Sequence, residues 1–199
     1  MKNTGGALAR AQRVEAQTGN APSSTAAFEN MGLTEASSRA IRDVFRFTHA
    51  TAVQDATLPH IMAGLDVLAR AKTGSGKTVG FLLPAIERLA RSGRPRRGEV
   101  SCLVVSPTRE LASQIGEEAK SLLTYHDFGC QVVFGGTNIN SERKRLMSQG
   151  VEFLIATPGR LIDHFESSNL SRAVQNLDVL VLSLIHISEP TRLRRISYA

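Results

Sequence analysis

The sequence predicts an α/β fold in which a mainly parallel sheet carries helices on both faces. Short apolar runs of strand length alternate along the chain with stretches whose apolar residues recur at helical spacing. The clearest unit is residues 66–81, DVLARAKTGSGKTVGF, where a strand, a glycine-containing turn and a helix follow one another. With 199 residues, of which 42% are hydrophobic, the chain is long enough for one domain with a sizeable core.

The predicted elements begin near Phe28, where the composition changes from small polar residues to apolar runs. Thr34 is typical of a helix N-cap, and residues 129–134 form an apolar run that ends at two glycines. In order, we expect helices over 34–44, 54–62, 79–91, 109–123, 141–148 and 157–165, and strands over 66–70, 100–106, 129–134, 153–156 and 177–182. Because parallel sheets bind ligands at the carboxyl ends of their strands, the turns that follow the strands are the candidate sites.

The turn after residues 66–70 has the pattern of a phosphate-binding loop. Gly74 and Gly76 permit backbone angles that let successive N–H groups surround one anion, and a helix N-terminus follows. Lys77 is expected to reach the β and γ phosphates of a nucleotide, and the Thr78 hydroxyl to bind Mg²⁺. The general pattern asks for glycine where this chain has Ala71. The predicted nucleotide-binding residues of this loop are Ala71, Lys72, Thr73, Gly74, Ser75, Gly76, Lys77 and Thr78, with Lys77 and Thr78 as the catalytic pair.

The charge and composition of the ends differ from those of the body. The net charge is +6, but residues 1–27 and 183–199 each carry +2, so the charge does not itself indicate a nucleic-acid surface. Residues 1–27 are poor in apolar side chains and are expected to form a disordered lead-in, with an organelle transit peptide as the alternative. Cys102 and Cys130 lie in apolar runs and are expected to be buried free thiols. No apolar run is long enough to span a membrane.

Five motifs in order resemble the first RecA-like domain of DEAD-box RNA helicases over residues 28–182. They are FRFTHATAVQ, AKTGSGKT, PTREL, the Gly135-Gly136 pair and TPGR. The family's phosphate loop begins with alanine, which accounts for Ala71. The resemblance implies a three-layer RecA-like domain of the P-loop NTPase class, with ATP and Mg²⁺ as its cofactors.

The first motif resembles the segment that reads adenine in this family. The resemblance implies that the Gln54 amide pairs with the adenine edge, that Phe28 stacks on the ring and that Phe47 supports the segment. Arg46 and Ala50 stand where glycine and proline are commoner, so the local turn departs from the family's pattern.

Three motifs resemble the loops that hold single-stranded RNA by its sugar–phosphate backbone. Arg109 and Arg160 carry charges suited to phosphates, and Gly136 and Gly159 permit a close approach of the backbone. Such contacts imply little sequence specificity, and contacts to the 2′-hydroxyl would favour RNA over DNA. The implied RNA-binding residues are Pro107, Thr108, Arg109, Glu110, Gly135, Gly136, Thr157, Pro158, Gly159 and Arg160.

The resemblance ends after Leu182, where the family continues into Asp-Glu-Ala-Asp. This chain reads SLIHISEPTRLRRISYA instead, and LSLIHISEPTR resembles one reading frame of a transposase adapter used to prepare sequencing libraries. We therefore expect residues 183–199 to be a non-native tail and the domain to be incomplete, without the family's acidic pair and its second RecA-like domain. The chain as written is expected to lack ATPase activity.

The sequence thus predicts part of an ATP-dependent RNA helicase that couples ATP binding and hydrolysis to local opening of RNA duplexes. A related DNA helicase and a non-catalytic nucleotide- and RNA-binding module are the alternatives. Its location is expected to be intracellular, in the cytoplasm, the nucleus or nucleolus, or an organelle such as the mitochondrion or plastid.

Overall fold

The computed structural model describes residues 12–15, 26–93, 99–148, 150–168 and 170–183 and confirms the predicted α/β fold. Each predicted helix and strand is present, with unchanged ends for the strand at 153–156 and shifted ends for the others, and β1, η1 and α7 were not predicted. The elements are β1 (Gln12–Glu15), the 3₁₀ turn η1 (Phe28–Met31), α1 (Glu35–Arg39), the π-helical η2 (Ala40–Phe45), α2 (Ala52–Met62), β2 (Val67–Arg70), α3 (Lys77–Ser92), β3 (Cys102–Val105), α4 (Arg109–Leu122), β4 (Cys130–Val133), α5 (Ile139–Ser148), β5 (Phe153–Ala156), α6 (Pro158–Ser167), α7 (Leu170–Ala173) and β6 (Val179–Leu182).

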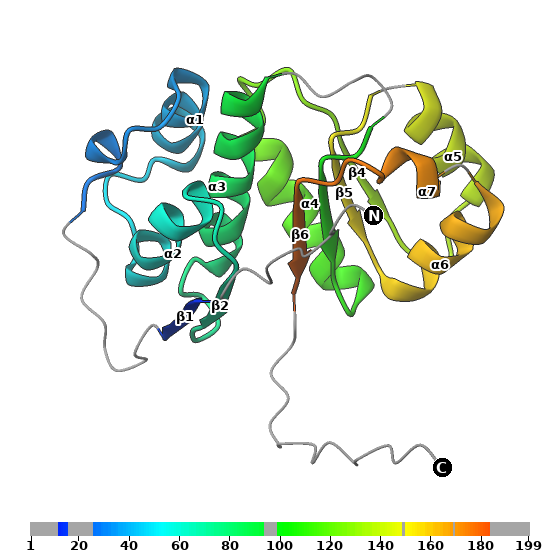
Figure 1. Ribbon diagram of the computed structural model, residues 1–199, viewed down its shortest axis with the longest axis horizontal. Coiled ribbons are helices and arrows are strands. Elements are labelled where there is room, and N and C mark those ends of the chain that lie inside the picture. Colours follow the sequence, from blue (N-terminus) through cyan, green and yellow to red (C-terminus); the bar gives the residue numbers. More distant parts are fainter. Residues whose placement is uncertain (1–11, 16–25, 94–98, 149, 169, 184–199) are drawn as a thin grey trace, which may run out of the picture.

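The central sheet has four parallel strands in the order β4-β5-β3-β6. Alternate residues of its strands enter two different cores: Cys102 and Phe153 join one, whereas Leu103 and Leu154 join the other. The first core is shared with α3 and α4, and the second with residues of α5, α6 and α7. Figure 1 shows α3 and α4 on the left of this sheet and α5, α6 and α7 on its right. The fold is therefore the expected three-layer arrangement.

The short helices that precede β2 pack against α3. The Glu87 side chain of α3 is fully buried, and its carboxylate accepts hydrogen bonds from the Thr34 backbone N–H at 3.0 Å and the Thr34 hydroxyl at 2.6 Å. Thr34 occupies the predicted N-cap position of α1, but its hydroxyl makes no cap hydrogen bond there because it donates to Glu87. Arg91 also pairs with Glu87 at 3.0 Å, so the buried carboxylate has charged and neutral partners.

Arg46 ends η2 in the left-handed region, with a φ of 56°. This is the conformation that glycine adopts without strain, and the chain forms the turn with arginine instead. The Phe47 backbone N–H, which follows, donates to the carbonyl of Ile41 at 3.1 Å. The turn that the sequence left in doubt is therefore formed, at a cost in backbone strain.

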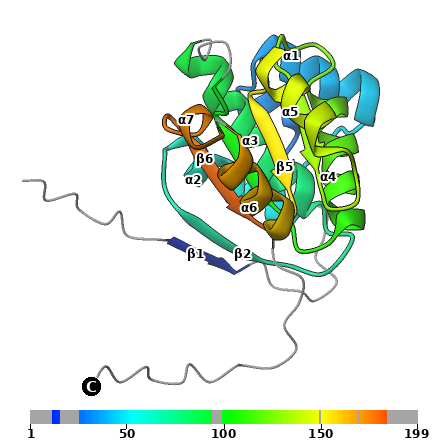
Figure 2. The same ribbon diagram turned by 90° about the vertical axis from the view of Figure 1, so that its right-hand side faces the viewer.

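β2 is not hydrogen-bonded to the central sheet; it pairs in parallel with β1. Figures 1 and 2 both show this pair apart from β6. The pairing differs from the expectation that residues 1–27 lack regular structure, and its physical reason is that the free edge of β2 offers unpaired N–H and C=O groups. Residues 1–11, 16–25 and the tail from 184 lie outside the described residues.

The strands β2 and β6 expose large apolar side chains. Leu68, Leu180 and Leu182 are 59%, 56% and 62% exposed. Among the described strands, β6 pairs with β3 and β2 with β1, so each has one edge without a partner strand in that part of the chain. Within the described parts of the chain, no helix has the length and apolar character needed to cross a membrane.

Candidate nucleotide and RNA site

The phosphate loop runs from the end of β2 to the first turn of α3. Gly74 and Gly76 have φ values of 77° and 83°, so both adopt the left-handed angles that the motif predicts. A Cβ on Gly76 would lie 2.5 Å from Gln54 Nε2, which leaves no room for a side chain there. The Ser75 hydroxyl is buried and has no hydrogen-bond partner within the described part of the chain. The loop therefore has the backbone shape and an unused donor that a phosphate group requires.

Lys77 and Thr78 begin α3 and make contacts within the protein. Lys77 Nζ donates to the carbonyls of Ala71 at 2.5 Å and Lys72 at 2.6 Å. Burial lowers the pKa of the Lys77 ammonium group. Burial raises the pKa of the Glu118 carboxyl on α4, and a hydrogen bond from Thr78 opposes that rise. If a nucleotide binds this loop, Lys77 Nζ would leave the carbonyls of Ala71 and Lys72 and contact phosphate oxygens instead.

Gln54 links the expected adenine-reading segment directly to the phosphate loop. It lies in the first turn of α2 and is 3% exposed. Its Oε1 accepts from the Thr51 backbone N–H at 2.9 Å, and its Nε2 donates to the Gly76 carbonyl at 3.1 Å. Thr51 Oγ1 in turn accepts from the Gln54 N–H, which completes a capping box. Both polar ends of the amide are thus engaged within the protein, and its pairing with adenine stays a prediction.

The two aromatic residues of this segment are placed differently from each other. Phe28 is only 4% exposed and belongs to the core, with its N–H donating to the Thr48 carbonyl at 3.1 Å. The Phe47 ring is 43% exposed and lies 5.4 Å from that of Phe45. The structure therefore presents the ring of Phe47 to solvent, whereas the expected stacking residue, Phe28, is covered by the core.

The PTREL motif joins β3 to α4 and is exposed from Pro107 to Glu110. Thr108 caps α4 by accepting a hydrogen bond from the Leu111 N–H at 3.2 Å. A shallow groove of about 590 Å³ runs along this part of the helix; it is lined by Thr108, Arg109, Glu110, Ser113, Gln114 and Glu117. Three residues of this groove, Ser113, Gln114 and Glu117, were missed by the sequence reasoning; their spacing on one helix face is the signal that would have found them.

The Gly135-Gly136 loop lies against Arg109. A Cβ on Gly136, whose φ is 94°, would stand 2.9 Å from Arg109 Nη1, and one on Gly135 would stand 3.5 Å from Arg109 Nη2. The guanidinium can occupy this place because Gly136 carries no side chain, whereas a Cβ on Gly135 would make only ordinary van der Waals contact with it. The motifs after β3 and β4 therefore meet at one surface.

The TPGR motif adjoins the same loop. Thr157 donates its backbone N–H to the carbonyl of Val133, and the exposed Pro158 and Gly159 begin α6. Arg160 Nη2 donates to the Thr137 carbonyl, and it lies 3.1 Å from the Thr137 hydroxyl. Three loops far apart in sequence thus come together at the carboxyl ends of β3, β4 and β5.

The comparison with known families decides the assignment. The sequence model described as DEAD/DEAH box helicase matches residues 51–189. The chain belongs to the DEAD/DEAH box helicase family. This agrees with the motif-based resemblance.

Individual helicases are also similar to this chain in sequence and structure. The chain is 48% identical over 157 residues to DEAD-box ATP-dependent RNA helicase 26 of Oryza sativa, covering 78% of this chain and 29% of the relative. It is 46% identical to ATP-dependent RNA helicase HAS1 of Meyerozyma guilliermondii, covering 84% of this chain and 29% of the relative. The crystal structure of the yeast DEAD-box splicing factor Prp28 matches 72% of this chain and 34% of its own, with a TM-score of 0.63 and 30% identity. The chain thus spans less than a third of these two curated relatives.

Among the described residues, the remaining His, Cys, Asp and Glu side chains are of the types that act as metal ligands and nucleophiles. Within the described ranges, no group of three His, Cys, Asp or Glu residues is placed to hold a metal ion. Cys102 and Cys130 are free thiols, and burial raises the pKa of both, that of Cys130 to about 11. They are therefore protonated at neutral pH and unsuited to act as nucleophiles.

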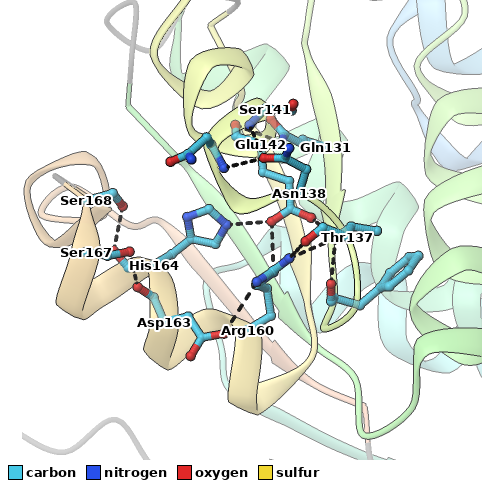
Figure 3. Close-up of polar contacts among 12 residues, drawn as sticks. Gln131, Thr137, Asn138, Ser141, Glu142, Arg160, Asp163, His164, Ser167 and Ser168 are labelled. Carbon is cyan, nitrogen blue, oxygen red and sulfur yellow. Dashed lines mark hydrogen bonds and ion pairs between the residues drawn. The ribbon is translucent and has the colours of Figure 1, made fainter.

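The helicase motifs also depend on residues that the sequence reasoning did not single out. Glu142 on α5 and His164 on α6 are buried and contact Arg160 or its partners (Figure 3). Arg160 and His164 are four residues apart, so they lie on one face of α6. That spacing was the available signal, but only the fold places Glu142 opposite them.

Proposed function

We propose that this chain supplies the ATP-binding and RNA-binding surfaces of the first RecA-like domain of an ATP-dependent RNA helicase. Family membership, the glycine angles of the phosphate loop and the unpartnered Ser75 hydroxyl support nucleotide binding. The observation that carries RNA binding is the convergence of Arg109, the Gly135-Gly136 loop and the TPGR motif at one edge of the sheet. In the whole protein, a second RecA-like domain would close on this edge, and ATP hydrolysis would be coupled to local opening of an RNA duplex.

The residues present fit a magnesium nucleotide. Successive N–H groups at the start of α3 and the Lys77 ammonium group would hold the phosphates, and Thr78 would supply one oxygen ligand to Mg²⁺. The phosphates and water would supply the remaining ligands, since the Thr78 hydroxyl is the one side-chain oxygen that the motif assigns to the ion. Bound Mg²⁺ would neutralise charge on the phosphates.

The converging loops offer glycines and one exposed arginine, which suit a sugar–phosphate chain of either kind. RNA rather than DNA is the proposed ligand because the similar proteins are named as RNA helicases. The test is fluorescence anisotropy with a labelled oligouridine and the deoxy oligomer of the same length, at low salt. We expect weak binding that favours RNA and weakens steeply as salt is added. Equal affinity for both oligomers would favour the DNA-helicase alternative, and no binding of either would contradict the proposed RNA surface.

A further inference from the structure

The Arg160 guanidinium, which was expected to neutralise an RNA phosphate, points into the protein. Its side chain is 8% exposed. Nε lies 3.0 Å from Glu142 Oε2, an ion pair whose N–H is not aligned as a hydrogen bond, and Nη1 lies 3.5 Å from Asp163 Oδ2. Nη2 donates to the Thr137 carbonyl. A phosphate could be reached only if the guanidinium left these partners.

Glu142 is the centre of this cluster (Figure 3). Its side chain is 8% exposed, Oε2 lies 2.8 Å from His164 Nε2, and Oε1 accepts from the Thr137 hydroxyl. The His164 ring is fully buried and directs its Nε2 at this carboxylate. The Glu142 carboxylate therefore contacts both α6 and the residue that follows the Gly135-Gly136 loop.

The same loop is fixed at its other end by the start of α5. Asn138 Oδ1 accepts hydrogen bonds from the N–H groups of Asn140 at 3.0 Å and Ser141 at 3.2 Å, and Gln131 Nε2 donates to the Glu142 carbonyl at 3.2 Å. Thr137 is exposed but has its hydroxyl and its carbonyl engaged by the cluster. The position of the loop backbone thus depends on the exposed Asn138 at its end and on the buried Glu142 carboxylate.

We propose that Arg160, Glu142 and His164 form a buried clamp that positions the Gly135–Thr137 loop, so that Arg160 is a positioning residue and not a phosphate ligand. The inference rests on the proposed RNA surface. Removing the Glu142 charge leaves the buried Arg160 guanidinium with the exposed Asp163 as its remaining ion-pair partner among the described residues, so the loop should shift when the clamp is broken. Arg109, which is exposed and lies against the same loop, is left as the arginine that contacts phosphate.

The sign of one substitution separates positioning from simple electrostatics. Glu142→Gln removes a negative charge, which by charge alone should leave RNA binding unchanged or strengthen it. If the clamp positions the loop, the same substitution should weaken binding by about twofold to thirtyfold. Asp163→Asn is the matched control, because it removes the same charge from a side chain that is 53% exposed and also faces Arg160. The control should bind RNA as tightly as the unmodified chain or slightly more tightly.

The salt dependence gives a second, independent measure in the same anisotropy assay with oligouridine. Arg109→Gln should lower the slope of log affinity against log salt by about 0.7, the value for one phosphate contact to a single strand. Arg160→Gln should lower the affinity while the slope stays unchanged. In the absence of RNA, hydrogen exchange of the amides at 135–138 should be faster in Glu142→Gln and in Thr137→Val. Thr137→Val alters an exposed residue without changing charge, so it carries the exchange test if Glu142→Gln does not fold.

Tighter or unchanged binding by Glu142→Gln, a slope lowered by about 0.7 in Arg160→Gln, or unchanged exchange at 135–138 in a folded variant overturns the clamp. If Arg109→Gln binds RNA more weakly and with a smaller salt slope, while Glu142→Gln binds RNA as tightly as Asp163→Asn, the clamp is wrong and the RNA surface stands. If the full chain binds no RNA, or Arg109→Gln changes nothing, the proposed function fails, and the clamp's role in RNA binding fails with it.

Discussion

Replacing Lys77 with alanine tests the nucleotide site at its most charged contact. In the free chain, Nζ donates to the carbonyls of Ala71 and Lys72, at 2.5 and 2.6 Å. Binding would exchange these neutral acceptors for phosphate oxygens, and a hydrogen bond between charged partners contributes about 1.5–3 kcal/mol. In the variant that contribution is absent, and water can hydrate the carbonyl of the exposed Lys72. The dissociation constant should therefore rise by about tenfold to a hundredfold.

The assay is a titration of the whole chain with a fluorescent ADP analogue, with circular dichroism to confirm that Lys77→Ala is folded. Lys120→Ala is the matched control, because it removes the same charge from an exposed position on α4 and should change the constant by less than about twofold. Burial lowers the pKa of Lys77, so the affinity should fall as the pH rises through that lowered pKa, and the variant should lack this dependence. An unchanged dissociation constant in a folded Lys77→Ala would refute the phosphate contact.

Three further substitutions have expected outcomes. Gln54→Ala removes the capping box and the contact to the Gly76 carbonyl, so it should lower the free energy of unfolding in urea by about 1 kcal/mol. In a competition assay, the same variant should prefer ADP over GDP less strongly than the unmodified chain does. Arg46→Gly relieves a left-handed φ at an exposed position and should raise stability by about 0.5–1 kcal/mol, so a lower urea midpoint would contradict the strain. The pKa of Glu118 is raised in the folded chain, so the folded state binds the proton more tightly than the unfolded state does. Stability is therefore lost as the pH rises from the unfolded pKa through the folded pKa. Glu118→Gln should stabilise the chain at neutral pH and lose this advantage in acid.

The sequence by itself determined the elements and the order of the motifs. Apolar residues at helical spacing in 79–91 predicted α3, and the continuous apolar run at 153–156 predicted β5 with its exact ends. Glycines at 74 and 76 predicted left-handed angles that the structure shows. These features are local, because the periodicity of side chains and the steric freedom of glycine act within a few residues.

Only the tertiary structure decided which partner each polar side chain takes. Arg160 was predicted to neutralise a phosphate because its motif resembles an RNA-binding loop and arginine carries a suitable charge, but α5 brings Glu142 to it from another part of the chain. Gln54 likewise gives its amide to Gly76, 22 residues away. A buried charge or amide takes the partner that compensates its desolvation, and that partner is fixed by packing between distant segments rather than by neighbours in sequence.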